Sequence, residues 1–502
     1  MSDSTSARCP RRSGEEPDVD GAETHTAYVV MVGEVVFKAK KPIRTAFADF
    51  GTAEQRRAAC EREVALNRRL CPDVYLGVAE LTDPCGGPNE SIVKMRRMPS
   101  DRRLARLVCR GADATAEVDA IAAVLARFHA RAERGDEIDC DAAPDVVAAR
   151  WQANVSEVTS YGCGVLPAAD LDEVQRRANR YLNGRKKLFD SRIHDRRIVD
   201  GHGDLLADDI FCLADGPRIL DCLDFDDHLR HVDGVDDAAC LAMDLEYLGR
   251  EDLAGRFLDR YCSEVLDEPA VSLRHHYIAY RAFVRAKVAC LRYTQGSRAA
   301  RDDARGHCDL ALRHLRVGTV RMAMVGGLPG TGKSTLSRRL AEVTGSAVIS
   351  SDRVRKELAG LDPRSRQVSG FGEGLYSGNM TDRTYTEMLR RAHEHLSEGR
   401  SVVLDASWTQ PAFRQRAVLA ASRTHSDLVE LECRAPRAVA VERIGSRPPG
   451  DSDATIAVYD VMAARTTAWT SATPVDTDTS CEEGVKTAEL AWHSTSGWRD
   501  DQ

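Results

Sequence analysis

The spacing of hydrophobic residues along the chain predicts a mixed N-terminal part. Over 27–42, the run AYVVMVGEVVFKAKKP predicts two strands rich in β-branched residues, joined by a turn at Gly33. Residues 52–70 then follow the 3.6-residue period of a helix. Further helical patterns follow, interrupted by strand and loop segments over 198–227, and helices resume over 236–315. This order predicts an α+β domain.

The pattern changes near residue 318, where apolar strands begin to alternate with amphipathic helices. Strands are expected at 320–325, 347–350, 401–407 and 427–433, and helices at 333–343, 352–360, 411–424 and 436–446. Such alternation is typical of βαβ units, which form a parallel sheet. One more strand is expected at 473–477 and one more helix near 482–492.

These changes divide the chain into four segments. Residues 1–23 are rich in Ser, Pro, Arg and acidic residues, so we expect a disordered tail there. The first domain is expected over 24–317 and the second over 318–480, with the boundary at 316–319 and a C-terminal tail over 481–502.

Composition limits the classes of function. A chain of 502 residues suits two or three domains, and 43% hydrophobic residues suffice for ordinary cores. The formal net charge of −8 argues against a general affinity for nucleic acids or anionic membranes. The 15 cysteines form no C-x-x-C pair, so we expect reduced thiols. We find no signal peptide and no apolar run that could cross a membrane, which favours a cytoplasmic protein. The oligomeric state is open.

The stretch GLPGTGKST matches the phosphate-binding P-loop pattern. A glycine-rich turn between a strand and a helix points backbone N–H groups at phosphate oxygens. Lys333 is expected to reach the β- and γ-phosphates of ATP, and the Ser334 hydroxyl to bind Mg²⁺. The residues expected to contact ATP are Gly327, Leu328, Pro329, Gly330, Thr331, Gly332, Lys333, Ser334 and Thr335.

Four charged residues are further candidates in this half. Asp352 follows a strand, so it could accept a proton from a substrate hydroxyl or bind Mg²⁺ through water; the alternative is a helix N-cap. Asp405 ends an apolar strand, the position of a Walker B acid that binds Mg²⁺, although it could only cap the next element. Arg443 and Arg447 share a helix face and could stabilise the transferring phosphoryl group, or form a solvated surface.

The pieces GLPGTGKST, SSDRVRKEL, VVLDASW and RIGSRPPGDSDA resemble the zeta-toxin and polynucleotide-kinase-like branch of P-loop kinases, also described as AAA-type ATPase domains. The resemblance covers about 318–480. It implies phosphoryl transfer from ATP to a hydroxyl of a small molecule or nucleotide. The sequence lacks an aromatic and basic groove for nucleic-acid ends.

A different pattern, GHGDLLADDI, stands in the first half. It resembles the HGDL…N loop of aminoglycoside phosphotransferases, choline kinases and protein-kinase-like enzymes. The resemblance implies that Asp204 accepts the proton of the acceptor hydroxyl. Asp209 stands where the family has a Mg²⁺-binding Asn; an Asp can also bind Mg²⁺, and it adds negative charge beside ATP. Asp221 is the expected second metal ligand, with Asp224 as the alternative.

The same resemblance assigns residues to the ATP site of the first half. Lys38 and Lys40 share one strand face, and one of them, preferably Lys38, is expected to contact the phosphates and pair with Glu63. An exposed strand and helix face is the alternative. The VKM segment ending at Met95 is expected to contact adenine. A glycine-rich flap between the first two strands is absent from the sequence.

Over 24–480 the chain resembles bifunctional aminoglycoside phosphotransferase/AAA-family ATPase proteins of bacteria. The expected fold is therefore an α+β protein-kinase-like domain followed by an α/β P-loop NTPase domain with a parallel sheet. The hypothesis is a phosphotransferase that uses ATP and Mg²⁺ to phosphorylate a hydroxyl of a small molecule. Two alternatives stay open: an ATP-binding sensor with a degenerate kinase-like domain, and a zeta-toxin-like kinase of sugar nucleotides.

Overall fold

The computed structural model describes residues 19–23, 26–44, 49–82, 89–162, 164–362, 374–446 and 454–494. They divide into two compact units. The first contains the described residues up to Glu133, together with Asp200–Val232 and Asp244–Val265. The second contains Arg134–Val199, Asp233–Met243 and the described residues from Leu266 onward. In the described part of the chain, no helix is long and apolar enough to cross a membrane.

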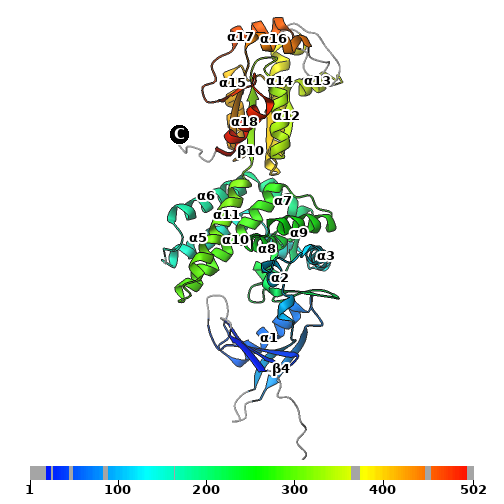
Figure 1. Cartoon of the computed structure of the whole chain (residues 1–502), viewed down its shortest axis with the longest axis vertical. Coiled ribbons are helices and arrows are strands. Elements are labelled where there is room, and N and C mark those ends of the chain that lie inside the picture. The colour runs from blue at the N-terminus through cyan, green and yellow to red at the C-terminus, as the bar shows by residue number, and fades with distance from the viewer. Residues whose placement is uncertain are drawn as a thin grey trace, which may run out of the picture. The chain divides into compact units, whose positions relative to one another are not determined.

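An antiparallel sheet and several helices form the first unit (Figure 1). Its strands are β1 (Val19–Glu23), β2 (Ala27–Val32), β3 (Val35–Lys40), β4 (Tyr75–Leu81), β5 (Glu90–Arg96), β7 (Ile210–Leu213) and β8 (Gly216–Ile219). Its helices are α1 (Ala53–Asn67), α2 (Leu104–Cys109), α3 (Thr115–Arg131) and α9 (Glu251–Glu264). The elements β6 (Ile198–Asp200), β9 (His231–Asp233) and α8 (Gly234–Tyr247) contain residues of both units.

The five-stranded sheet of the first unit has the order β1-β2-β3-β5-β4. The predicted hairpin of β2 and β3 is confirmed, with Gly33 at φ +55° in its turn. The segment expected as a disordered tail contributes β1, because Val19–Glu23 pairs antiparallel with the open edge of β2. Helix α1 packs on β4 and β5, and Cys60 and Val64 join Val93 of the sheet in one apolar core.

Helices and a parallel sheet form the second unit. The helices are α4 (Asp136–Cys140), α5 (Pro144–Ser160), α6 (Ala168–Gly184), α7 (Lys186–His194), α10 (Val271–Thr294), α11 (Ala300–Val317), α12 (Lys333–Thr344), α13 (Ser351–Leu358), α14 (Gly378–Ser397), α15 (Pro411–Arg423), α16 (Arg437–Ser446), α17 (Ile456–Arg465) and α18 (Cys481–Ser494). The strands are β10 (Arg321–Gly326), β11 (Ala347–Ser350), β12 (Val402–Asp405), β13 (Asp427–Arg434) and β14 (Thr473–Asp476).

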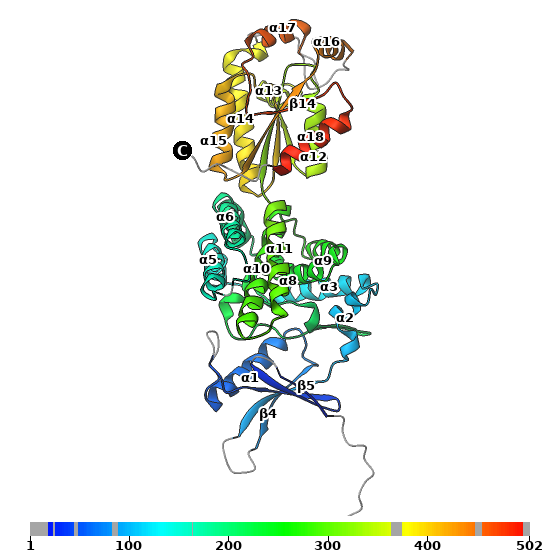
Figure 2. The ribbon, with the colours of Figure 1, turned by 60° about the vertical axis from the view of Figure 1, so that its left-hand side comes forward.

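The predicted parallel sheet is confirmed, with the order β11-β12-β10-β13-β14 and parallel pairing throughout. Helices α12 and α18 cover one face, and α14 and α15 cover the other (Figure 2). Every residue of the central strand β10 is buried, as a strand covered on both faces requires. The carboxyl end of β10 lies beside the carboxyl ends of the neighbouring strands. Ligands bind at this edge in open α/β sheets.

The last helix of the described chain, α18, belongs to this packed sheet. The strand expected near 473 and the helix expected near 482 are both present, as β14 and α18. Ala488, Ala491 and Trp492 are buried in the same core as Val325 of β10. These side chains recur at helical spacing and cover apolar sheet surface, so packing continues beyond residue 480, where the domain was expected to end.

Candidate phosphate-binding and catalytic sites

The P-loop lies between β10 and α12 in a backbone conformation that needs glycine. Gly327, Gly330 and Gly332 have φ values of +133°, +77° and +82°. A Cβ atom on Gly330 would stand 2.4 Å from the carbonyl oxygen of Ala440, and one on Gly327 would stand 2.5 Å from that of Cys433. The loop is therefore packed against neighbouring backbone in a shape that side chains would destroy.

Two side chains at the start of α12 turn toward this loop and the sheet. Lys333 Nζ donates a hydrogen bond to the Leu328 carbonyl oxygen at 2.8 Å, so the ammonium group lies over the loop. The Ser334 hydroxyl is hydrogen-bonded to Asp405 at the end of β12. Burial raises the pKa of the Asp405 carboxyl, and Lys333 partly opposes this shift. A hydroxyl and a buried carboxylate provide oxygen donors that fit Mg²⁺.

Strand register explains why these residues meet. Asp405 pairs with Val325 on β10 and with Ser350 on β11, so three strand ends lie at one edge of the sheet. Asp352 follows in the first turn of α13 and accepts a hydrogen bond from Arg355 Nη1 at 2.6 Å. The Arg355 guanidinium also lies 4.7 Å from the ring centroid of Tyr376.

A cavity of about 750 Å³ opens at this edge of the sheet. Its walls include Lys333, Ser334, Asp352, Asp405 and Arg443. The structure thus gathers five of the predicted residues from four different segments. Arg443 Nη2 donates to the Thr477 carbonyl oxygen at 2.8 Å. Arg447 lies outside the described residues.

Aromatic residues that the sequence analysis did not identify complete one wall of the cavity. Tyr385 of α14 stacks on Phe413 of α15 with 4.1 Å between ring centroids, and both line the cavity. Tyr385 Oη lies 3.3 Å from the Ser407 hydroxyl. Neither aromatic residue belongs to a recognisable motif, and only the folded helices bring them to the loop.

In the first unit, two lysines and three carboxylates form one network, which is buried at Glu63 and Lys40 and exposed at Asp221. Lys38 Nζ lies 2.9 Å from Glu63 Oε1 and 3.0 Å from Asp221 Oδ1. Lys40 Nζ lies 2.7 Å from Glu63 Oε2 and 2.9 Å from Asp224 Oδ2. Burial opposes ionisation of Glu63, but Lys38 and Lys40 outweigh it and lower its pKa. Both lysines and both candidate metal ligands that the sequence left as alternatives therefore belong to this network.

The loop that carries Asp204 is fixed by hydrogen bonds on both sides. His202 is fully buried, and its Nε2 lies 3.0 Å from the Leu220 carbonyl oxygen. The Leu223 N–H donates to the His202 carbonyl oxygen at 3.0 Å. Gly203 has φ +87°, and a Cβ atom there would stand 3.0 Å from Arg230 Cγ. These bonds join the Asp204 loop to the segment that carries Asp221.

Asp209 has an unfavourable electrostatic environment. Burial raises the pKa of its carboxyl well above the ordinary value, and the negative charges of Asp221 and Asp204 raise it further. The three carboxylates thus influence one another, as the ligands of a shared cation would. Met95, expected to contact adenine, is buried in the apolar core with Val93, and its role in binding stays a prediction.

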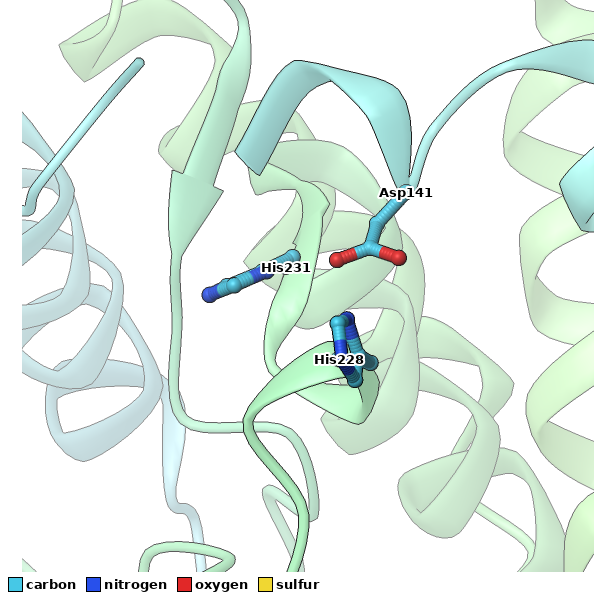
Figure 3. A group of neighbouring side chains, drawn as sticks. All are labelled: Asp141, His228 and His231. Atoms are coloured by element: carbon cyan, nitrogen blue, oxygen red, sulfur yellow. The ribbon is translucent and has the colours of Figure 1, made fainter. Parts of the chain in front are cut away.

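A pair of imidazoles lies farther along the first unit. His228 and His231 lie edge to face with 5.9 Å between their ring centroids (Figure 3). Asp141, also drawn there, belongs to the second unit. Two imidazoles are fewer ligands than the three or four that protein metal sites use, so the pair is not a metal centre by itself.

Three kinds of comparison relate the chain to known proteins. Residues 322–468 match the family model described as an AAA domain. Among solved structures, a choline kinase from Cryptosporidium parvum Iowa II is 9% identical with a TM-score of 0.41, covering 60% of this chain and 89% of its own. A gluconokinase from Sinorhizobium meliloti 1021 is 17% identical with a TM-score of 0.26, covering 34% and 90%.

The expected fold class is confirmed. The first unit contains the antiparallel sheet expected of the aminoglycoside phosphotransferase and protein-kinase-like fold, and the predicted Lys38–Glu63 ion pair is present beside it. The second contains a P-loop domain with a five-stranded parallel sheet. The uncharacterized protein Rv2004c of Mycobacterium tuberculosis is 46% identical over 480 residues, which is 96% of each chain. The chain belongs to the same family as this mycobacterial protein.

Proposed function

We propose that the chain is an ATP-dependent phosphotransferase that moves the γ-phosphoryl group of ATP to a hydroxyl of a small molecule. The observation that carries this proposal is the cavity that holds Lys333, Ser334, Asp352 and Asp405 together. Its volume of about 750 Å³ lies within the range of small-molecule sites. Such a cavity has room for a nucleotide and a small acceptor side by side.

Each residue of the cavity has a role in this proposal. The N–H groups of the P-loop and Lys333 bind the phosphates of ATP, and Asp352 receives the proton of the acceptor hydroxyl. The bond between γ-phosphorus and the β–γ bridging oxygen breaks as the acceptor oxygen bonds to phosphorus, and ADP leaves. Arg355 holds the Asp352 carboxylate in place through its 2.6 Å hydrogen bond. Arg443 would stabilise the charge on the transferring group, the role that the sequence analysis also gives to Arg447.

Ser334 and Asp405 are the residues that would hold Mg²⁺ in this cavity. When bound, the ion neutralises charge that develops on the phosphate oxygens. The hydrogen bond between Ser334 and Asp405 fits this assignment, because it brings the two oxygen donors together.

The first unit is proposed as a second site for the same chemistry. Asp204 would be the base, Lys38 would bind ATP phosphates and Asp209 and Asp221 would hold Mg²⁺. Glu63 would position Lys38, since the two are 2.9 Å apart. Asp221 is also 3.0 Å from Lys38, so this lysine would exchange one of its two carboxylate partners for phosphate.

A second candidate function is an ATP-binding sensor whose first unit no longer transfers phosphate. The environment of Asp209 favours it. Burial and the nearby charges of Asp221 and Asp204 raise the pKa of a carboxyl that stands at the Asn position of related kinases. A carboxyl that stays protonated binds Mg²⁺ poorly.

The two functions predict different results with γ-labelled ATP. The full chain is incubated with a pool of amino sugars, aminoglycosides, nucleosides and sugar nucleotides. Lys333→Ala and Asp204→Ala remove the central group of each site, while Lys486→Ala and Asp215→Ala change exposed residues elsewhere. A labelled product lost with Lys333→Ala or Asp204→Ala, and kept in the controls, identifies the active site.

The acceptor in that product also decides between substrate classes. A labelled sugar nucleotide that depends on Lys333 would support the zeta-toxin-like alternative. Binding of ATP without any labelled product would contradict the phosphotransferase proposal and favour the sensor.

A further inference from the structure

The second unit contains another polar cavity, of about 440 Å³, at the opposite edge of its parallel sheet. It lies where α6, α10 and α11 meet the amino ends of β10 and β13. Its walls include Arg176, Arg177, Arg180, Arg185, His425 and Asp427. The P-loop follows the carboxyl end of β10, which is a strand of six residues or about 20 Å long. The two cavities share no lining residue.

Arg185 is the most unusual residue of this cavity. Its side chain is 1% exposed, although arginine is rarely buried without a carboxylate partner. It donates to the Thr424 carbonyl oxygen at 2.5 Å and to the Ser426 hydroxyl at 3.3 Å. Among the described residues, no carboxylate forms an ion pair with Arg185, and its buried Nε has no hydrogen-bond partner. Burial lowers the pKa of this guanidinium to about 10.

The surroundings of Arg185 are positively charged. Of the lining residues, four are arginines and only Asp427 is acidic. Arg180 Nη2 lies 2.8 Å from Asp427 Oδ1, so that carboxylate is already paired. Burial lowers the pKa of His425, and the charges of Arg180, Arg185 and Lys186 lower it further. A second imidazole in the wall, that of His276, is buried, and its Nδ1 has no partner among the described residues.

We propose that this cavity binds the phosphate group of a small phosphorylated metabolite. A buried cation without an ion-pair partner is unfavourable, and an anion in the cavity would supply the missing negative charge. A phosphate dianion has several oxygens that guanidinium groups can share. Arg177 already pairs with Glu173 at 2.6 Å, as Arg180 does with Asp427, so Arg176 and Arg185 are the lining arginines with no ion pair among the described residues. The volume suits a sugar phosphate. This site is independent of the phosphotransferase proposal.

The test uses calorimetry on the full chain carrying Lys333→Ala, which weakens phosphate binding at the P-loop. The probes are glucose 6-phosphate and inorganic phosphate, with glucose as the uncharged control. Both anions are expected to bind and glucose is not. Arg185→Gln should weaken anion binding by about tenfold or more, since it removes a charge-assisted contact.

Arg176→Gln gives a second variant that does not depend on a buried residue, because Arg176 is exposed at the rim. It should also weaken anion binding. Arg292→Gln, an exposed arginine of α10 that does not line the cavity, is the matched control and should bind like the parent. The proposal is overturned if neither anion binds at millimolar concentration, or if Arg185→Gln and Arg176→Gln both bind as tightly as the control. Since ATP is absent, either result is independent of phosphoryl transfer.

Discussion

Glu63→Gln should destabilise the first unit strongly. The Glu63 side chain is 1% exposed and accepts from two ammonium groups, at 2.9 Å from Lys38 and 2.7 Å from Lys40. Each contact has a Coulomb energy of about 6 kcal/mol at an effective dielectric constant of about 20, before the cost of desolvation. Breaking a buried ion pair costs about 3–5 kcal/mol. In the variant, Lys38 still pairs with Asp221 and Lys40 with Asp224. We therefore expect the free energy of unfolding of the first unit to fall by about 3 kcal/mol, the lower end of this range.

Hydrogen exchange measures this loss locally, which matters because a chain with two compact units is not expected to unfold in one step. About 3 kcal/mol corresponds to amides of β3 and α1 exchanging about 100-fold faster. Glu61→Gln is the matched control on the same helix, where an exposed carboxylate lies 2.9 Å from exposed Arg57. It should change stability by less than about 0.5 kcal/mol. Equal exchange in the two variants would refute the reasoning.

Other predictions concern pH, the loop and the metal ligands. The pKa of Glu63 is lowered in the folded state, so its contribution to the stability of the first unit is present above about pH 4.3. This contribution is lost as the pH falls through the lower pKa of the folded state, and hydrogen exchange measured against pH should show the loss. The pKa of Asp209 is raised in the folded state, so ionisation of this carboxyl lowers the stability of the first unit as the pH rises above about 3.9. Asp209→Asn removes this loss, so it should stabilise the unit at neutral pH and make its stability depend less on pH above about 3.9. Gly330→Ala should lower the free energy of unfolding by about 1–3 kcal/mol more than Gly345→Ala does, because both have left-handed backbone but only Gly330 is crowded; denaturant unfolding would contradict this if the two losses were equal. Asp405→Asn should weaken ATP binding about tenfold or more with Mg²⁺ and little in EDTA, as calorimetry can show.

Much of the second unit could be predicted from the sequence. Apolar runs such as that of β10 are long and are separated by helices, and the P-loop motif fixes both its own conformation and the neighbouring elements. Asp405 could be identified because it ends such a run. In the first unit, the Lys38–Glu63 pair follows from one strand, one helix and a family resemblance.

The remaining features depend on contacts that no local pattern records. Tyr385 and Phe413 come from two helices and meet only after packing. From the sequence alone, Arg185 would be expected on the surface. In the fold it is buried and donates to the backbone carbonyl of Thr424, which lies 239 positions away in the chain. The participation of Lys40 in the Glu63 network could not be separated from that of Lys38, because both share one strand face.

If one chain has two separate sites for ATP, it binds two nucleotides, and their number can be measured. Equilibrium dialysis of the full chain with Mg²⁺ and labelled ATP should give about two nucleotides per chain, and about one after either Lys333→Ala or Lys38→Ala. Lys486→Ala, an exposed lysine of α18, should leave the number at two. A number unaffected by Lys333→Ala, or no binding by the unaltered chain, would contradict the account.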